Sequence, residues 1–184
     1  GKDSAVFEGG NIKKAVNGVA GATIKPLTKS GIVKVEAKVT DGPFYATEVK
    51  ELIITSGEPA KLILDSDTDI LLANKKSKAN VAVKVVDEYG NLTADQFSTV
   101  SIFAFGDVTL DMAGDKNSLM PGLQKDTTDG VANASILSGD KIGEANIYAV
   151  LMSDEIEEKM ISATMEKDDI DFKGGIGASR NISI

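Results

Sequence analysis

The sequence predicts an all-β protein built as a β-sandwich. Apolar and polar residues alternate with a period of two along most segments, as in strands with one buried face. Glycine, asparagine and aspartate recur between these segments, where they favour tight turns. No segment of helical length carries the 3.6-residue apolar stripe of an amphipathic helix.

The composition is that of a folded chain with an aliphatic core. Apolar residues occupy 42% of the 184 positions, which is typical of a globular protein. Aromatic residues make up only 5% and tryptophan is absent, so valine, isoleucine, leucine and alanine must form the core. A chain of this length holds one large domain or two modest ones.

Two missing residue types narrow the possible functions. The sequence has no cysteine and no histidine, which excludes disulfides, thiol nucleophiles, thiolate zinc sites and a serine–histidine–carboxylate triad. Its 28 acidic residues gather in turns and linkers, without a tryptophan- or histidine-lined cleft for a paired-carboxylate mechanism. We therefore expect no catalytic residues and no enzyme activity.

The net charge and hydropathy exclude two classes of partner. A net charge of −8 argues against nucleic acid, because phosphates require a basic face. No apolar run reaches the length of a membrane span, and the opening GKDSAVFEGG does not have the pattern of a signal peptide. The sequence predicts no membrane insertion in this segment.

The clearest strand, expected at 79–87, runs directly into a tight turn. Its valines alternate along one face, and their β-branched side chains favour the extended backbone. Asp87, Gly90 and Asn91 follow. Gly90 tolerates positive φ, and the side chain of Asp87 or Asn91 can hydrogen-bond to the local backbone. We expect a core strand that is capped by a surface turn at one pole of the fold.

The most informative feature is internal similarity. Residues Asn17–Ala37 align without a gap to Asp129–Ala149, at a constant offset of 112, with eight of 21 positions identical. Each copy reads as a turn, an alternating strand, a glycine-containing turn and a second alternating strand. The identical pairs are Gly18/Gly130, Val19/Val131, Ala20/Ala132, Ala22/Ala134, Ile24/Ile136, Lys29/Lys141, Gly31/Gly143 and Ala37/Ala149.

This offset predicts the domain organisation. A complete sandwich is expected at 57–168, residues 1–56 match the second half of such a unit, and 169–184 form a linker or the first strand of a further unit. The expected strands are 60–65, 69–73, 79–87, 97–105, 107–112, 130–137, 143–151 and 157–166. The expected core residues are Leu62, Leu64, Val81, Val83, Val85, Val100, Ile102, Ala134, Ile136, Ile147 and Ala149.

A half-unit at residues 1–56 would leave an apolar face uncovered and a strand edge unpaired. Two explanations are open at this point. Either the half-unit reflects truncation at a fragment boundary, or the tail Gly177–Ile184, in which Ile182 and Ile184 alternate, donates a strand that completes it.

Several motifs occur in the order seen in one known family. VAVKVVDEYGNLTADQFSTVSIFA is followed by DTTDGVANASIL and IGEANIYAVL. The combination resembles the bacterial immunoglobulin-like domains of the invasin and intimin type, well over 57–166 and in part over 15–55. Leu92 stands where that family often has proline. The matching residues are Asp87, Gly90, Asn91, Val100, Ile102, Phe103, Thr127, Thr128, Gly130, Ala132, Gly143 and Ala145.

The resemblance implies tandem immunoglobulin-like β-sandwiches with a structural or adhesive function. In such arrays the modules are spacers, and adhesion usually resides in a distal domain. We expect a non-catalytic, extracellular structural or adhesion module of a bacterial cell-surface protein. Its expected partners are neighbouring immunoglobulin-like units and a host or surface receptor or a polysaccharide. The alternatives are a surface-layer protein domain and a carbohydrate-binding module of a secreted enzyme.

Two groups of residues are candidate ligand sites. Asp65, Asp67 and Asp69 place alternate carboxylates near a domain junction, where calcium could stiffen the linker, but the glycine and distal glutamate of an EF-hand loop are missing. A solvated acidic turn is the favoured interpretation, and calcium is the one cofactor left open. Phe44 and Tyr45 lie in a loop, where the pair either faces a ligand or packs over one end of the sandwich.

Overall fold

The computed structural model describes residues 4–40, 47–94, 96–162 and 176–184. The chain divides into two compact units, Gly1–Ser56 and Gly57–Ile184.

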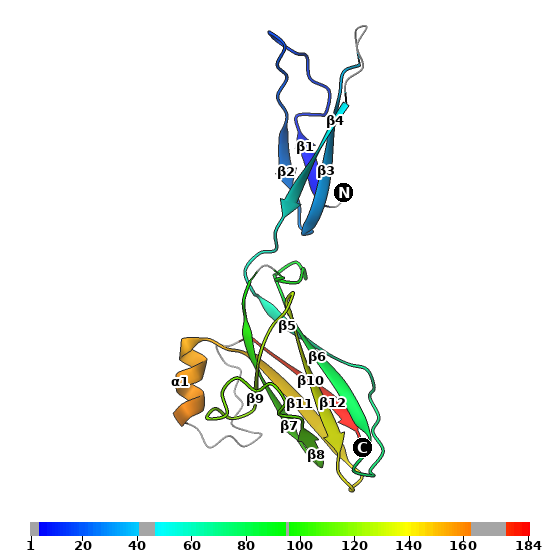
Figure 1. Cartoon of the computed structure of the whole chain (residues 1–184), viewed down its shortest axis with the longest axis vertical. Helices are drawn as coiled ribbons and strands as arrows, with labels where there is room; N and C mark the ends of the chain where they lie inside the picture. Colours follow the sequence, from blue (N-terminus) through cyan, green and yellow to red (C-terminus); the bar gives the residue numbers. More distant parts are fainter. Residues whose placement is uncertain (1–3, 41–46, 95, 163–175) are drawn as a thin grey trace. The chain divides into compact units, whose positions relative to one another are not determined.

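The second unit is a β-sandwich of two four-stranded antiparallel sheets (Figure 1). One sheet has the order β5 (Lys61–Ser66), β6 (Lys78–Val86), β10 (Val131–Ser138) and β8 (Val108–Leu110). The other has the order β12 (Gly177–Ser183), β11 (Glu144–Leu151), β7 (Thr99–Phe105) and β9 (Leu123–Asp126). Strands from both halves of the unit's sequence lie within each sheet, so neither sheet forms from local contacts alone.

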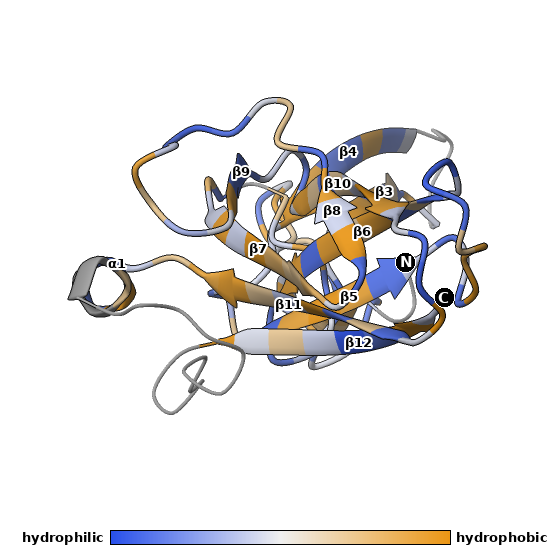
Figure 2. Ribbon diagram, turned by 90° about the horizontal axis from the view of Figure 1, so that it is seen from below, coloured by the Kyte–Doolittle hydropathy of each residue, from blue (hydrophilic) through white to orange (hydrophobic). Residues whose placement is uncertain are grey.

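The core lies between the two sheets and confirms the expected residues. Every predicted core residue is buried, and all belong to one apolar cluster that draws on both sheets. Strand β10 shows the reason: Ala132, Ala134 and Ile136 point inward, whereas Asn133 between them is exposed. Hydrophobic colour runs along β6 and β11 in Figure 2. The alternation along each strand therefore separates the inner face from the outer face, as the sequence predicts.

A second apolar cluster covers the outer face of the β11–β7 sheet and includes the helix α1 (Asp154–Ser162). Met160 and Ile156 of α1 pack with Phe103 and Val150. The helix begins after Ser153, whose hydroxyl accepts a hydrogen bond from the backbone N–H of Ile156, and its first turn is acidic, as favours a helix N-terminus. The strand expected at 157–166 is therefore wrong over the described residues 157–162, which are helical.

Further differences from the expected strands concern the edges of the sheets. No strand forms at 69–73, where only an isolated bridge joins Ile70 to Ser183. Strand β9 is absent from the expected strands, and β12 falls in the tail that the sequence predicts as a linker, the first strand of a further unit or a donated strand. Residues 177–184 are neither a linker nor the start of a further unit: β12 pairs with β11 over seven residues, and Ile182 is buried in the core of the second unit. The tail therefore does not donate a strand to residues 1–56 of this chain.

The first unit contains two two-stranded antiparallel sheets. One joins β1 (Ala5–Glu8) to β2 (Thr23–Pro26), and the other joins β3 (Gly31–Lys38) to β4 (Thr47–Ile54). Among the residues of this unit that the structure describes, Val33 alone is buried. The strands are therefore formed, but their apolar side chains are not enclosed as they are in the second unit.

The segments that align in sequence adopt the same turn. Asn17 and Asp129 have φ values of 52° and 51°, and the glycines that follow them, Gly18 and Gly130, have 80° and 75°. Glycine adopts this left-handed backbone without steric cost, and asparagine and aspartate tolerate it. Isolated bridges close both turns, Val16 to Val19 in one and Thr128 to Val131 in the other. The similarity in sequence thus reflects a shared local structure.

The hairpin that follows also keeps its register. Gly31 pairs with Ile54 in the β3–β4 hairpin, and Gly143 exchanges backbone hydrogen bonds with Ile184 beyond the end of the β11–β12 pair. The first strands correspond at an offset of 112 and the second strands at 130, so the connection in the second unit is 18 residues longer. That longer connection contains α1. A constant offset of 112 therefore cannot locate β12, because it projects β4 onto α1 and the residues after it.

Replacement of Ile147 by alanine is expected to lower the free energy of unfolding of the second unit by about 2–5 kcal/mol, since it opens a cavity in the closed core. Ile147 is fully buried in β11. The matched control is Ile142→Ala, at a position 89% exposed, which should change stability by no more than about 0.5 kcal/mol. Equal effects of the two substitutions in urea titrations would contradict the core described above.

Candidate functional site

The carboxylate of Asp87, just beyond the end of β6, accepts four hydrogen bonds. One oxygen, Oδ1, accepts hydrogen bonds from the backbone N–H groups of Tyr89 at 3.0 Å and Asn91 at 2.8 Å. The other, Oδ2, accepts from the backbone N–H of Gly57 at 3.0 Å and from Nδ2 of Asn91 at 2.8 Å. Asp87 is buried, and Gly90 has the positive φ that closes the turn. The sequence predicts this turn but not its contact with Gly57.

These hydrogen bonds lower the pKa of Asp87 from its ordinary value of 3.8 to about 2. The largest cause is the hydrogen bond from the side chain of Asn91, and the backbone N–H groups of Gly57, Asn91 and Tyr89 act in the same direction, against the opposing effect of burial. A carboxylate that accepts several hydrogen bonds is stabilised in its charged form. Asp87 is therefore ionised at neutral pH and holds its turn in place.

The same pole of the sandwich fixes the point where the chain enters the unit. The backbone N–H of Ala60 donates to the carbonyl of Val86 at 2.8 Å, and Nε2 of Gln96 donates to the carbonyl of Gly57 at 3.1 Å. Together with the bond from Gly57 to Asp87, these contacts tie residues 57–60 to the turn after β6. The arrangement is structural, since all four bonds that the carboxylate accepts come from the protein itself.

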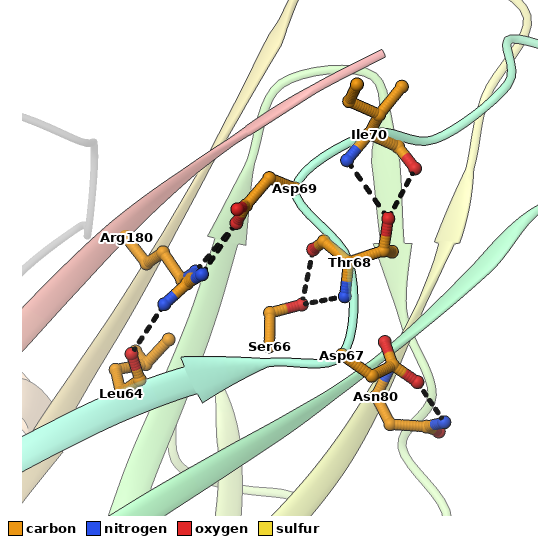
Figure 3. A network of polar contacts seen from close by, with 8 residues as sticks. All are labelled: Leu64, Ser66, Asp67, Thr68, Asp69, Ile70, Asn80 and Arg180. Carbon is orange, nitrogen blue, oxygen red and sulfur yellow. Dashed lines mark hydrogen bonds and ion pairs between the residues drawn. The ribbon is translucent and has the colours of Figure 1, made fainter.

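The three aspartates considered for calcium each have a different partner, and Figure 3 shows two of them, Asp67 and Asp69. Asp69 faces Arg180, whose Nη2 lies 2.6 Å from Oδ1. The carboxylate of Asp67 accepts hydrogen bonds from the backbone and side chain of Asn80 at 2.9 and 2.7 Å. The third carboxylate has a partner on the adjacent strand, since Oδ2 of Asp65 lies 2.6 Å from Nζ of Lys84.

The partners of two of these aspartates also shift their pKa values. The hydrogen bond from Lys84 lowers the pKa of Asp65, and the backbone hydrogen bond from Asn80 lowers the pKa of Asp67. Within the part of the chain that the structure describes, no group of three or more acidic, histidine or cysteine residues could hold a metal ion. The side chains act as separate polar contacts around β5 and the loop that follows it.

The other candidate pair, Phe44 and Tyr45, lies outside the described residues. A different aromatic residue marks a hollow of the second unit. Phe97 is fully exposed, and it borders an open hollow of about 570 Å³ whose lining also includes Gln96, Asn117 and Glu157. Sequence analysis missed this place, although an isolated phenylalanine in the polar run ADQFSTV is a signal that could have indicated it.

Most polar groups around this hollow are already bonded within the protein. Nε2 of Gln124 donates to Oγ of Ser101 at 2.9 Å and to the carbonyl of Pro121 at 2.8 Å. Nζ of Lys116 pairs with Asp126. The lining thus combines the Phe97 ring and side-chain amides with the acidic residues Glu58, Asp154 and Glu157.

Comparison with known proteins gives fold relatives only. No protein-family model matches the sequence, and no curated protein matches it. A glycosyl hydrolase family 2 member from Bacteroides cellulosilyticus is similar to 98% of this chain, with 16% identity and a TM-score of 0.52, over 21% of its own length. A β-glycosidase from Bacteroides vulgatus is similar to 99% of this chain, with 13% identity and a TM-score of 0.50, also over 21% of its length.

The D0–D1 domain of intimin is also similar, with 15% identity and a TM-score of 0.41, over 98% of this chain and 79% of that one. This chain spans about a fifth of the length of the two enzymes. The described residues include no helix with the length and apolarity needed to cross a membrane. With its two packed antiparallel sheets, the protein is all-β and has an immunoglobulin-like sandwich fold.

Replacement of Asp87 by asparagine is expected to destabilise the second unit at neutral pH, because the amide presents only one acceptor oxygen to three backbone donors and the Asn91 side chain. In the native protein the pKa of Asp87 is lower when folded than when unfolded. Its contribution to stability is therefore complete above about pH 4 and is lost as the pH falls towards 2.

Thermal unfolding between pH 7 and pH 2 checks this expectation. The Asp87→Asn variant should lose the part of the acid dependence that Asp87 causes, so the two midpoints should approach each other below pH 3. Asp111→Asn is a suitable control, since the carboxylate of Asp111 accepts a local hydrogen bond from Ala113 alone among the bonds described. A constant difference between Asp87→Asn and the native protein at every pH would contradict the role given to the charge.

Proposed function

We propose that this chain is a non-catalytic, extracellular structural or adhesion module of a bacterial cell-surface protein, and that it acts as a rigid spacer in a tandem array. The motif order that resembles the invasin and intimin type supports the assignment. The observation that carries it is the position of the chain's entry and exit in the second unit.

Entry and exit lie at opposite ends of the sandwich. Gly57 is bound to the turn after β6, at the pole where β10 begins, because the backbone N–H of Val85 donates to the carbonyl of Gly130. At the far end of β10, beyond Ser138, Gly143 exchanges backbone hydrogen bonds with Ile184. Figure 1 shows the start of β5 and the C-terminus at opposite ends of this unit. A module with this geometry can be joined end to end.

The internal hydrogen bonding at both ends suits a load-bearing role. The entry segment is held by the ionised Asp87, and the exit strand β12 is paired along its full length with β11 and carries Ile182 into the core. A pull on the two ends would act on strands that are anchored by several hydrogen bonds and by core packing. The polar groups where the chain enters the unit hydrogen-bond to one another and stabilise the fold. This supports a structural spacer in preference to a catalytic domain.

Surface location is tested by labelling intact cells of the source organism with an antibody raised against residues 57–184. The spacer proposal predicts labelling without permeabilisation and release of the epitope by external protease, while a cytoplasmic control protein stays protected. Labelling that requires permeabilisation would contradict it. An ordered two-dimensional lattice of label would instead favour the surface-layer alternative.

One observation favours a second candidate, carbohydrate binding. An exposed aromatic ring beside amide side chains is a surface that can stack on a sugar and hydrogen-bond to its hydroxyl groups, and Phe97 with Gln96 and Asn117 has this character. The fold relatives that are glycoside hydrolases do not decide the question, since their likeness is one of fold.

If Phe97 binds sugar, binding to at least one polysaccharide on a glycan array should fall about tenfold or more in Phe97→Ala, because the ring supplies the stacking surface. Leu119→Ala is the matched control, since Leu119 is another exposed apolar residue of this unit and is absent from the lining of the hollow. No glycan binding by the native protein, or equal binding by both variants, would exclude this site.

A further inference from the structure

Among its described residues, the first unit has counterparts of β8, β10, β11 and β12 but none of β5, β6 and β7. Eight positions of the first unit correspond to fully or almost fully buried core positions of the second. Of these eight only Val33 is buried in the first unit, and the rest are exposed or half-buried. The corresponding pairs are Ala20/Ala132, Ala22/Ala134, Ile24/Ile136, Val33/Ala145, Val35/Ile147, Ala37/Ala149, Leu52/Ile182 and Ile54/Ile184.

The central strands of the two units also differ in the number of strands that pair with them. Strand β11 has two neighbours, β12 on one side and β7 on the other, whereas its counterpart β3 has only β4. Since β4 corresponds to β12 in register, the vacant edge of β3 is the one that β7 occupies in the second unit. An exposed edge next to exposed apolar side chains is a ready acceptor for another strand.

Strand β2 is shorter than its counterpart, and the missing part is informative. Strand β10 begins at Val131, and its first four residues pair with Lys84 to Val81 of β6. The corresponding residues 19–22 are not in a strand, although the turn before them is the same as in the second unit. The strand is therefore incomplete where a partner equivalent to β6 would lie.

We infer that the first unit is an acceptor for a polypeptide segment with the strand pattern of residues 57–106, which would complete it as a sandwich. In the second unit this segment supplies β5, β6 and β7 and covers the positions that are uncovered in the first. The place of β8 is already taken in the first unit by β1, which pairs with β2 as β8 pairs with β10. The added strands would pair in the observed register, with the counterpart of Val81 beside Ala22 and the counterpart of Ile102 beside Ala37. Burial of the apolar face provides the driving force.

A second copy of this chain fits the vacancy less well. Its own residues 57–106 are already engaged in its second unit, where Val81 and Ile102 are fully enclosed. Its first unit presents the same β1 to β4 strands and therefore lacks the same β6 and β7 equivalents. The occupant indicated by the structure is a segment of the β5–β7 type that is not otherwise folded into a sandwich.

The test adds a copy of residues 57–106 ahead of Gly1 in the otherwise unaltered chain and measures amide hydrogen exchange. In the extended chain, the amides of residues 19–22 and the free edge of β3 should gain roughly tenfold or more in protection, since they enter a closed sheet. Binding of a hydrophobic dye should fall as the face is covered. The second unit, which is complete already, should keep its exchange rates.

The matched control carries the same extension with Val83→Asp and Ile102→Asp in the copied segment only. It should give no gain in protection, because the added strands cannot bury their inner faces. Equal protection from both extensions, or no protection from either, would overturn the inference. So would an unextended chain that sediments as a dimer and already protects residues 19–22, since that result would assign the face to a second copy.

Discussion

The burial of two apolar sheet faces against each other is the constraint on which the structure depends. Alanine, valine, leucine and isoleucine fill the space between the sheets of the second unit, and no tryptophan or disulfide assists them. Small and β-branched side chains must then pack closely, because each inner face contributes little volume per residue. The first unit shows the other side of this constraint: it has the same turn and the same hairpin register, yet almost all of its apolar side chains remain in contact with solvent.

The charged residues of the second unit serve the fold at its margins. Asp87 organises a turn, Asp69 binds Arg180 of the last strand, and Asp65 pairs with Lys84 across two neighbouring strands. Exposed ion pairs of this kind contribute little to stability one by one, whereas the buried carboxylate of Asp87 has four donors and cannot be replaced without leaving them unpaired. An acidic sequence is thus compatible with a protein that uses its carboxylates mainly for its own turns and strand ends.

The sequence predicts most of the sandwich because two-residue alternation and turn chemistry are local signals. The core residues of β6, β10 and β11, and the turn at Asp87, follow from them. The edge strands of the sheets have weaker sequence signals. Strand β9 spans only four residues, and the half-buried positions of β12 include the small Ala178 and the charged Arg180 in place of large apolar residues. The sequence does not predict helix α1, because its apolar stripe covers only nine residues. The helix also lies in a connection that is longer than its counterpart in the first unit, so the repeat alignment at a constant offset gives no indication of it. Contacts such as Gly57 with Asp87 depend on tertiary structure and have no sequence signal.

The unequal connections in the two hairpins have a practical meaning for protein engineering. The closure of β11 on β12 does not require a short loop, because the register is the same as in the β3–β4 hairpin despite 18 additional residues. Loop length adds only slowly to the entropy cost of closure, and the hairpin's stability resides in its strand pairing and in Ile182. The connection between β11 and β12 therefore tolerates added length, and an epitope or a fluorescent reporter inserted there would begin and end at the pole of Glu58 and Pro59, where the chain enters the unit.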